Sequence, residues 1–149
     1  MIIAAAAMFG YAITIIRLPV GVTEAVTQMD LGPLGFIVAV MALIFVLGMF
    51  LESIAIILIT TPILLPTLNA LGIDLIWYGV LLMINLELAM ITPPVGMNLF
   101  AIKGITGAPL SEIVKGTAPY VSIMIIGMAI LIAIPDLATW LPLRAGFGR

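Results

Sequence analysis

The fold is decided by residues 75–102, which read LIWYGVLLMINLELAMITPPVGMNLFAI. A proline inside a helix removes one backbone N–H and pushes its ring into the preceding turn, and two prolines stand together here, Pro93-Pro94. Gly96 adds backbone freedom just after them. The pattern predicts one membrane helix broken into two half-helices, 75–91 and 97–103, with an unwound joint between them.

The joint has two interpretations, which the residues alone leave open. The two prolines would free the carbonyls of Ala89 and Met90, and in hydrocarbon each freed carbonyl costs several kcal/mol unless something satisfies it. Free carbonyls at such joints coordinate cations, and half-helix N-termini attract anions. Thr92 and Asn98 would add side-chain oxygens. The alternative is a structural kink whose carbonyls are met by neighbouring hydroxyls.

Composition places the chain in lipid. Of its 149 residues, 64% are hydrophobic and 8% are charged, whereas soluble domains average about 45–50% apolar and about 25% charged residues. The chain has no cysteine and no histidine, and its net charge is −2. These counts exclude thiol nucleophiles, histidine triads and zinc sites, and they give no basic surface for nucleic acid. No Ser–Lys pair or acid pair stands at catalytic spacing, so we expect no enzyme and no cofactor. Oxygen ligation of hard cations such as Na⁺ remains.

The spacing of charges divides the chain into membrane segments. We expect an all-α, polytopic membrane protein whose residues 1–149 form a single membrane domain. A polar connection from Arg17 to Pro33 follows the first apolar run, and Trp140 lies where an interfacial aromatic anchor would. The further predicted helices are 2–16, a pair of arms at 34–48 and 54–70, and a last helix at 117–134.

Glu52 is the second informative residue, because it stands alone between two uncharged runs, 31–51 and 53–73. One interpretation is a re-entrant hairpin, whose arms enter and leave on the same face and whose tip at 48–53 lies inside the membrane. The other is two full spans joined by a tight turn at the surface, with Glu52 in water. A buried acid would have to be paired or functional.

Asn85 and Glu87 lie in the first half of the broken helix. Glu87 precedes Pro94 by seven residues, which is about two turns, so it faces much the same side as the break. Both residues are candidates to line a cavity, and Glu87 has the alternative of reaching water near a helix end.

Two blocks of sequence together resemble a known family. Residues 47–53 (LGMFLES) lead to 61–66 (TPILLP), and residues 91–100 read ITPPVGMNLF. Their order, with Leu71 to Asp74 between them, is similar to the large permease subunit of tripartite ATP-independent periplasmic (TRAP) transporters. The resemblance covers essentially the whole chain. Glu52 departs from it, since the family more often has aspartate at the hairpin tip.

The resemblance implies a secondary transporter that imports organic acid anions, of the C4-dicarboxylate type, with sodium across the bacterial inner membrane. The implied partners are a small membrane subunit and a periplasmic substrate-binding protein. The family's large subunit has two inverted repeats, each with a hairpin and a broken helix, and works by an elevator-type movement. This chain resembles the second, C-terminal repeat, so the N-terminal repeat would be a further partner. The rival prediction is a non-transporting membrane scaffold or fragment.

The resemblance also implies that the hairpin tip and the joint face each other and hold sodium beside the substrate. The residues that we expect at this site are Gly48, Glu52, Ser53, Thr92, Pro93, Pro94, Gly96 and Asn98.

Overall fold

The computed structural model describes residues 32–146 and scattered positions between 5 and 24. The predicted helix 2–16 and most of the connection that follows it lie outside the described residues. Within the described residues the secondary structure is helical, without strands, which confirms the all-α prediction for this part. The helices are α3 (Pro33–Gly48), α4 (Ser53–Ala70), α5 (Leu75–Met90), α6 (Met97–Thr106), α7 (Leu110–Ala133) and α8 (Asp136–Arg144).

The bounds of α3, α4 and α5 lie within one residue of those expected from the sequence, α6 ends three residues later than expected, and the largest differences lie at α7 and after it. Helix α7 begins at Leu110, not at 117, because Pro109 provides an extended residue just before it and Glu112 places a negative charge in the first turn, where the helix dipole favours it. Pro119 lies inside α7 without ending it. Residues 136–144, which follow the last predicted helix, form helix α8.

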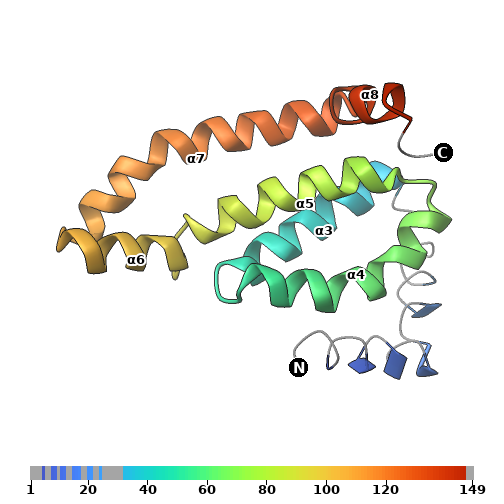
Figure 1. Cartoon of the computed structure of the whole chain (residues 1–149), viewed down its shortest axis with the longest axis horizontal. Helices are drawn as coiled ribbons and strands as arrows, with labels where there is room; N and C mark the ends of the chain where they lie inside the picture. Colours follow the sequence, from blue (N-terminus) through green and yellow to red (C-terminus); the bar gives the residue numbers. More distant parts are fainter. Residues whose placement is uncertain are drawn as a thin grey trace.

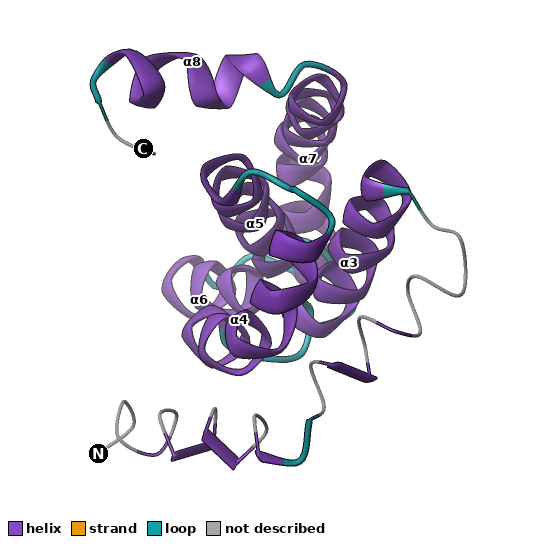
Figure 2. Cartoon of the chain, turned by 90° about the vertical axis from the view of Figure 1, so that its right-hand side faces the viewer, coloured by secondary structure: helices purple, strands orange, loops and turns teal. Residues whose placement is uncertain are grey.

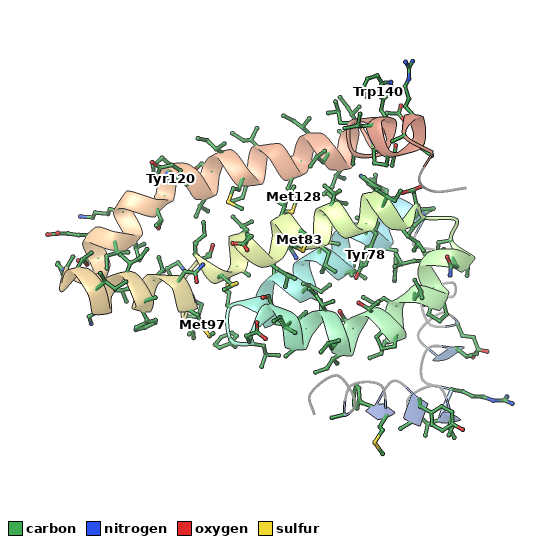
Figure 3. The ribbon with its side chains drawn as sticks, viewed as in Figure 1. Tyr78, Met83, Met97, Tyr120, Met128 and Trp140 are labelled. Atoms are coloured by element: carbon green, nitrogen blue, oxygen red, sulfur yellow. The ribbon has the colours of Figure 1, made fainter. Side chains whose placement is uncertain are left out.

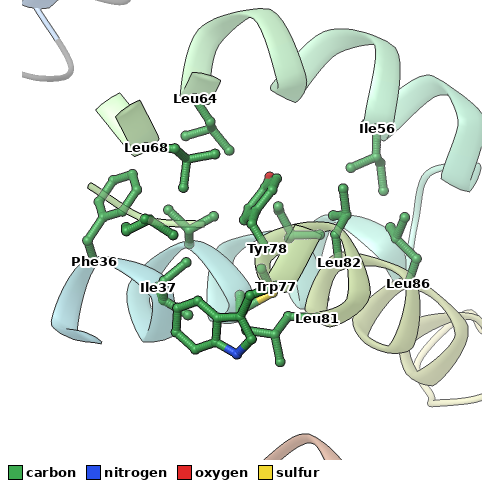
Figure 4. Packing of buried hydrophobic residues seen from close by; sticks show 14 residues of the cluster. Phe36, Ile37, Ile56, Leu64, Leu68, Trp77, Tyr78, Leu81, Leu82 and Leu86 are labelled. Carbon is green, nitrogen blue, oxygen red and sulfur yellow. The ribbon is translucent and has the colours of Figure 1, made fainter. Parts of the chain in front are cut away.

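Helices α3 and α5 form the centre of the fold, and α4 covers them (Figure 4). Ile37 of α3 and Leu81 of α5 have no exposed surface, and Leu68 of α4 is almost fully buried with them. Figure 4 shows Leu64 and Leu68 reaching from α4 toward the ring of Tyr78. The hairpin of α3 and α4 and the helix α5 therefore share one apolar core.

Helix α7 runs along both halves of the broken helix, contacting α5 and α6 (Figure 1). One hydrogen bond fixes its far end: Trp77 Nε1 of α5 donates to the Leu131 carbonyl oxygen at 2.7 Å. In an unbroken helix the N–H of residue 135 would reach this carbonyl, but residue 135 is proline and has none. The indole thus satisfies a carbonyl that Pro135 frees. Met128 also reaches from α7 toward α5 (Figure 3).

Helix α8 turns across the end of the bundle, at a steep angle to α7 (Figure 2). Its Arg144 guanidinium carbon lies 5.0 Å from the centre of the Trp140 ring, within the range of a cation–π contact. Trp140 is exposed on this short helix, and its role as an interfacial anchor stays a prediction.

Two described helices are long and apolar enough to cross a membrane, α4 with 18 residues and α7 with 24. Helices α3 and α5 are apolar but shorter, with 16 residues each. In the most apolar stretch of α7 no residue is buried within the chain. Its exposed isoleucines therefore need lipid or another protein around them.

Candidate ion and substrate site

The hairpin tip packs against the end of α5. A Cβ added to Gly48, the last residue of α3, would lie 2.7 Å from the Cβ of Ala89. Real Cβ atoms do not approach so closely, so only glycine allows these two helices to meet here. Figure 1 shows the consequence: the loop between α3 and α4 lies beside the joint between α5 and α6.

The joint covers residues 91–96, between the last residue of α5 and the first of α6. Gly96 has φ +55°, and a Cβ there would lie 2.9 Å from the Thr92 carbonyl oxygen. This left-handed conformation in tight contact with backbone favours glycine strongly. The unwound joint predicted from the prolines is thus a compact turn closed by Gly96.

Thr92 satisfies two carbonyls at the end of α5. Its N–H donates to Ala89 O at 3.2 Å, and its hydroxyl donates to Leu88 O at 2.6 Å. The expectation that Pro93 leaves the Ala89 carbonyl free is therefore wrong, because the backbone tightens into a shorter turn that brings the Thr92 N–H to it. Part of the break is filled, as the kink interpretation requires.

The carbonyls further along the joint have no such partner. In the described part of the chain, no N–H or O–H group donates to the carbonyl oxygens of residues 91–95. Helix α6 then begins without a side-chain cap on its N–H groups, and the half-buried Asn98 is its second residue. The joint thus offers carbonyl oxygens, which suit a hard cation, next to a helix N-terminus, which suits an anion.

Glu52 acts as the N-cap of α4. Its Oε2 accepts from the Ala55 N–H at 3.2 Å, and its Oε1 accepts from the Ser53 hydroxyl at 3.3 Å. Such a cap satisfies donors that a helix start leaves unpaired. Within this chain Glu52 is exposed, so the structure places it and Ser53 at the tip but gives the carboxylate a local structural role.

Asn85 and Glu87 lie on different faces of α5. Asn85 is fully buried, and its Nδ2 donates to the Met41 carbonyl oxygen of α3 at 2.9 Å. Among the described residues nothing donates to its buried Oδ1, and Asn85 is one of the residues around an apolar groove between α3, α5 and α7. Glu87 is exposed and is not among the residues that line this groove.

Helix α7 contributes residues that the sequence did not point to. An open groove of about 240 Å³ separates the joint from α7, and hydroxyls line it from both sides, Thr92 from the joint and Thr117 and Ser122 from α7. The α7 hydroxyls donate to the helix's own carbonyls, Val114 O and Ala118 O. Their oxygens therefore keep lone pairs toward the groove. The sequence feature that could have identified these α7 residues is the spacing of small residues on one face of the helix.

Comparison with known proteins points to one family of transport proteins. Residues 1–137 match the family model described as the tripartite ATP-independent periplasmic transporter, DctM component. A C4-dicarboxylate TRAP transporter large permease protein of Vibrio cholerae is 37% identical over 95% of the chain and 31% of its own length. An ectoine TRAP transporter large permease protein of Halomonas elongata is 30% identical over 95% of the chain and 33% of its own length.

A sialic acid TRAP transporter large permease protein of Vibrio cholerae is 29% identical, over 95% of the chain and 34% of its own length. The chain thus spans about a third of the length of the curated relatives it matches. These relatives are transport permeases and not enzymes. The chain belongs to the family of the large permease subunit, the DctM component, of tripartite ATP-independent periplasmic transporters.

Proposed function

We propose that this chain forms the C-terminal repeat of a sodium-coupled importer of organic acid anions in the bacterial inner membrane. The tip at 48–53 and the joint at 92–96 would form one site. Carbonyl oxygens of the joint would hold Na⁺, and the N-terminus of α6 would attract a substrate carboxylate. The two elements would move together as part of an elevator-type transport domain.

The position of the hairpin tip carries this proposal. Helix α3 has 16 residues, which is about 24 Å at 1.5 Å per residue, less than the roughly 30 Å of a bilayer core. The other arm, α4, has 18 residues and is long enough to cross, so the support comes from where the tip lies and not from arm length. Helix α7 has 24 residues, or about 36 Å. The tip lies beside the joint, while α6 and the first part of α7 continue past it (Figure 1). This supports a re-entrant hairpin whose tip ends within the membrane.

Substrate class and partners rest on the relatives. Their names cover C4-dicarboxylate, ectoine and sialic acid, and the two relatives that are most similar among these differ in substrate. We propose a C4-dicarboxylate because the relative with 37% identity carries that name. The proposed partners are a small membrane subunit and a periplasmic substrate-binding protein.

Sodium-driven uptake tests the proposal. The chain would replace the matched region of the Vibrio cholerae relative, and the resulting large subunit would be reconstituted with its small subunit and binding protein in proteoliposomes. We expect uptake of radiolabelled dicarboxylate that depends on a sodium gradient and falls at least tenfold in the Thr92→Ala, Asn98→Ala double variant. A Thr106→Ala variant, at the far end of α6, serves as the control. Unchanged uptake in the double variant would reduce the joint to a structural kink.

Two observations favour the second candidate, a membrane scaffold that docks other helices without transporting. Such a scaffold predicts an exposed Glu52 and a filled break, and Glu52 is exposed while Thr92 satisfies two of the carbonyls. If the chain is a scaffold, a correctly assembled complex should take up no organic acid of the kinds named for the relatives.

A further inference from the structure

Helix α4 carries polar groups on a face that is turned away from the apolar core. Its buried residues, Ile56 and Leu64 among them, pack into the core. A second set of residues follows at spacings of three and four, which place them on one other face of the helix. Leu65 and Asn69 of this set are exposed within the chain, and the remaining three are half-buried. The set, which we call the outer stripe of α4, consists of Leu58, Thr61, Pro62, Leu65 and Asn69.

Two backbone carbonyls along the outer stripe lose their helical donors. In a regular helix a carbonyl accepts from the N–H four residues later, and for Leu58 and Pro62 those positions are Pro62 and Pro66, which have no N–H. At Leu131, where a proline causes the same loss, the Trp77 indole donates instead. Among the described residues no side chain takes this role for Leu58 O or Pro62 O. Both carbonyls point along the helix from one stripe position toward the next.

The Thr61 hydroxyl is a third polar group of the outer stripe. The neighbouring Thr60 hydroxyl donates to Ile56 O at 2.8 Å, which is a common way for threonine to be satisfied inside a helix. Within the part of the chain that the structure describes, the Thr61 hydroxyl makes no hydrogen bond. The polar groups therefore continue from Asn69, at the hairpin base, to the middle of α4.

The needs of these groups limit what can surround the outer stripe. Backbone carbonyls without donors are costly in hydrocarbon, and at membrane depth they occur where they meet protein or line a water-filled cavity. A packed helix would have to bring separate donors to Leu58 O, Pro62 O and Thr61, because these groups lie at different heights along α4. Water supplies a donor at each height without any matching side chain. Water therefore fits the whole stripe better than lipid or an apolar helix does.

We infer that the outer stripe of α4 faces water and forms one wall of an aqueous path, which leads from the membrane surface at the hairpin base toward the tip at 48–53. The stripe starts at Asn69, next to the last residue of α4, and α4 begins at Ser53 beside the tip. The destination of the path rests on the ion and substrate site proposed above. The contact of the stripe with water does not depend on that site.

Cysteine reactivity in membranes tests this inference. The chain would take the place of the matched region of the Vibrio cholerae relative, with any cysteine of that protein replaced by serine. It would carry Thr61→Cys, Leu65→Cys or the control Ile130→Cys, one at a time. Ile130 is 45% exposed within the chain and Leu65 38%, so the two are closely matched. Ile130 also lies nearer to the end of α7 than Leu65 and Thr61 lie to the end of α4.

The two helix ends lie on the same side of the molecule. The Trp77 bond to Leu131 holds the end of α7 to the first turns of α5, and α5 follows the end of α4 after a short turn. Depth in the membrane alone would therefore make Ile130→Cys the fastest of the three variants to react. A small, charged, membrane-impermeant methanethiosulfonate would be added from the side of the hairpin base, and labelling in SDS would give the total thiol.

We expect Leu65→Cys and Thr61→Cys to react at least tenfold faster than Ile130→Cys. Rates at both stripe positions that do not exceed the Ile130→Cys rate would overturn the inference, because lipid or a packed helix would then cover the stripe. Uptake is not part of this readout. Fast labelling of the stripe in a complex that shows no sodium-driven uptake would contradict the proposed function and leave the water-facing stripe in place.

Discussion

At the scale of single residues, the sequence identifies the positions at which the backbone approaches another helix closely or adopts a left-handed conformation. Gly48 allows α3 to meet α5, and Gly96 adopts the left-handed turn that closes the joint. Both positions follow from local signals, a glycine at the end of an apolar run and a glycine after two prolines. The use of Glu52 as a helix cap could not be anticipated, because serine is the usual N-cap residue and glutamate is not, yet Ser53 is the first residue of α4.

Replacing Gly48 by alanine should destabilise the hairpin. The new Cβ would lie 2.7 Å from that of Ala89, so α3 and α5 must move apart, and overpacking of this kind costs about 1–3 kcal/mol. Gly79→Ala is the matched control, because a Cβ there meets nothing within 4 Å. The free energy of unfolding in detergent micelles or bicelles is the measurement. Equal stability of the two variants would contradict the close approach.

Two changes at Glu52 separate its capping role from a role for its charge. Glu52→Ala removes the acceptor of the Ala55 N–H and the Ser53 hydroxyl, so it should lower the thermal stability of the chain. Glu52→Gln keeps an acceptor oxygen and should lose less stability. If the charge also contributes to the proposed sodium site, Glu52→Gln should still raise the sodium concentration that gives half-maximal uptake. An unchanged sodium dependence in Glu52→Gln would leave Glu52 as a cap only.

At the scale of helices, charges and prolines in the sequence predict most helix bounds closely. The contacts between helices depend on the tertiary structure and could not be predicted in this way. Helix α3 begins at Pro33, one residue before the expected arm at 34. The agreement is close because a run without charged residues can be recognised from the local sequence. Helix α7 begins seven residues earlier than 117, since the extended Pro109 precedes Leu110 and Glu112 lies in the first turn. The hydrogen bond between Asn85 and Met41 joins residues that are 44 positions apart in the sequence, so no local sequence pattern predicts it.

Trp77→Phe should loosen α7 from α5. The indole donates to the Leu131 carbonyl, which Pro135 leaves without a helical partner, so its loss leaves that carbonyl unsatisfied. Side-chain hydrogen bonds between membrane helices contribute about 0.6–1.7 kcal/mol. Trp140→Phe is the control, because Trp140 is exposed on α8. Unfolding followed by circular dichroism should show a larger loss in Trp77→Phe, and equal losses would contradict the role of this bond.

At the scale of the whole molecule, the central claim is that the α3–α4 hairpin turns back inside the membrane, next to the broken helix. In this account the end of α6 lies at the far surface of the membrane, and Ile105 there is 87% exposed within the chain. On the same account Asn69, near the end of α4, lies at the surface on the side of the hairpin base. If the hairpin were two full spans, its tip at Phe50 would reach the same surface as Ile105.

The most direct test uses the absence of cysteine from this chain. Single variants Phe50→Cys, Asn69→Cys and Ile105→Cys, in right-side-out and inside-out vesicles, would react with a bulky membrane-impermeant maleimide. We predict that Cys at Asn69 and at Ile105 reacts from opposite sides, and that Cys at Phe50 reacts at least tenfold more slowly than at Ile105 from the Ile105 side. Equally fast labelling of the Phe50 and Ile105 variants from that side would show two full spans and contradict the re-entrant hairpin.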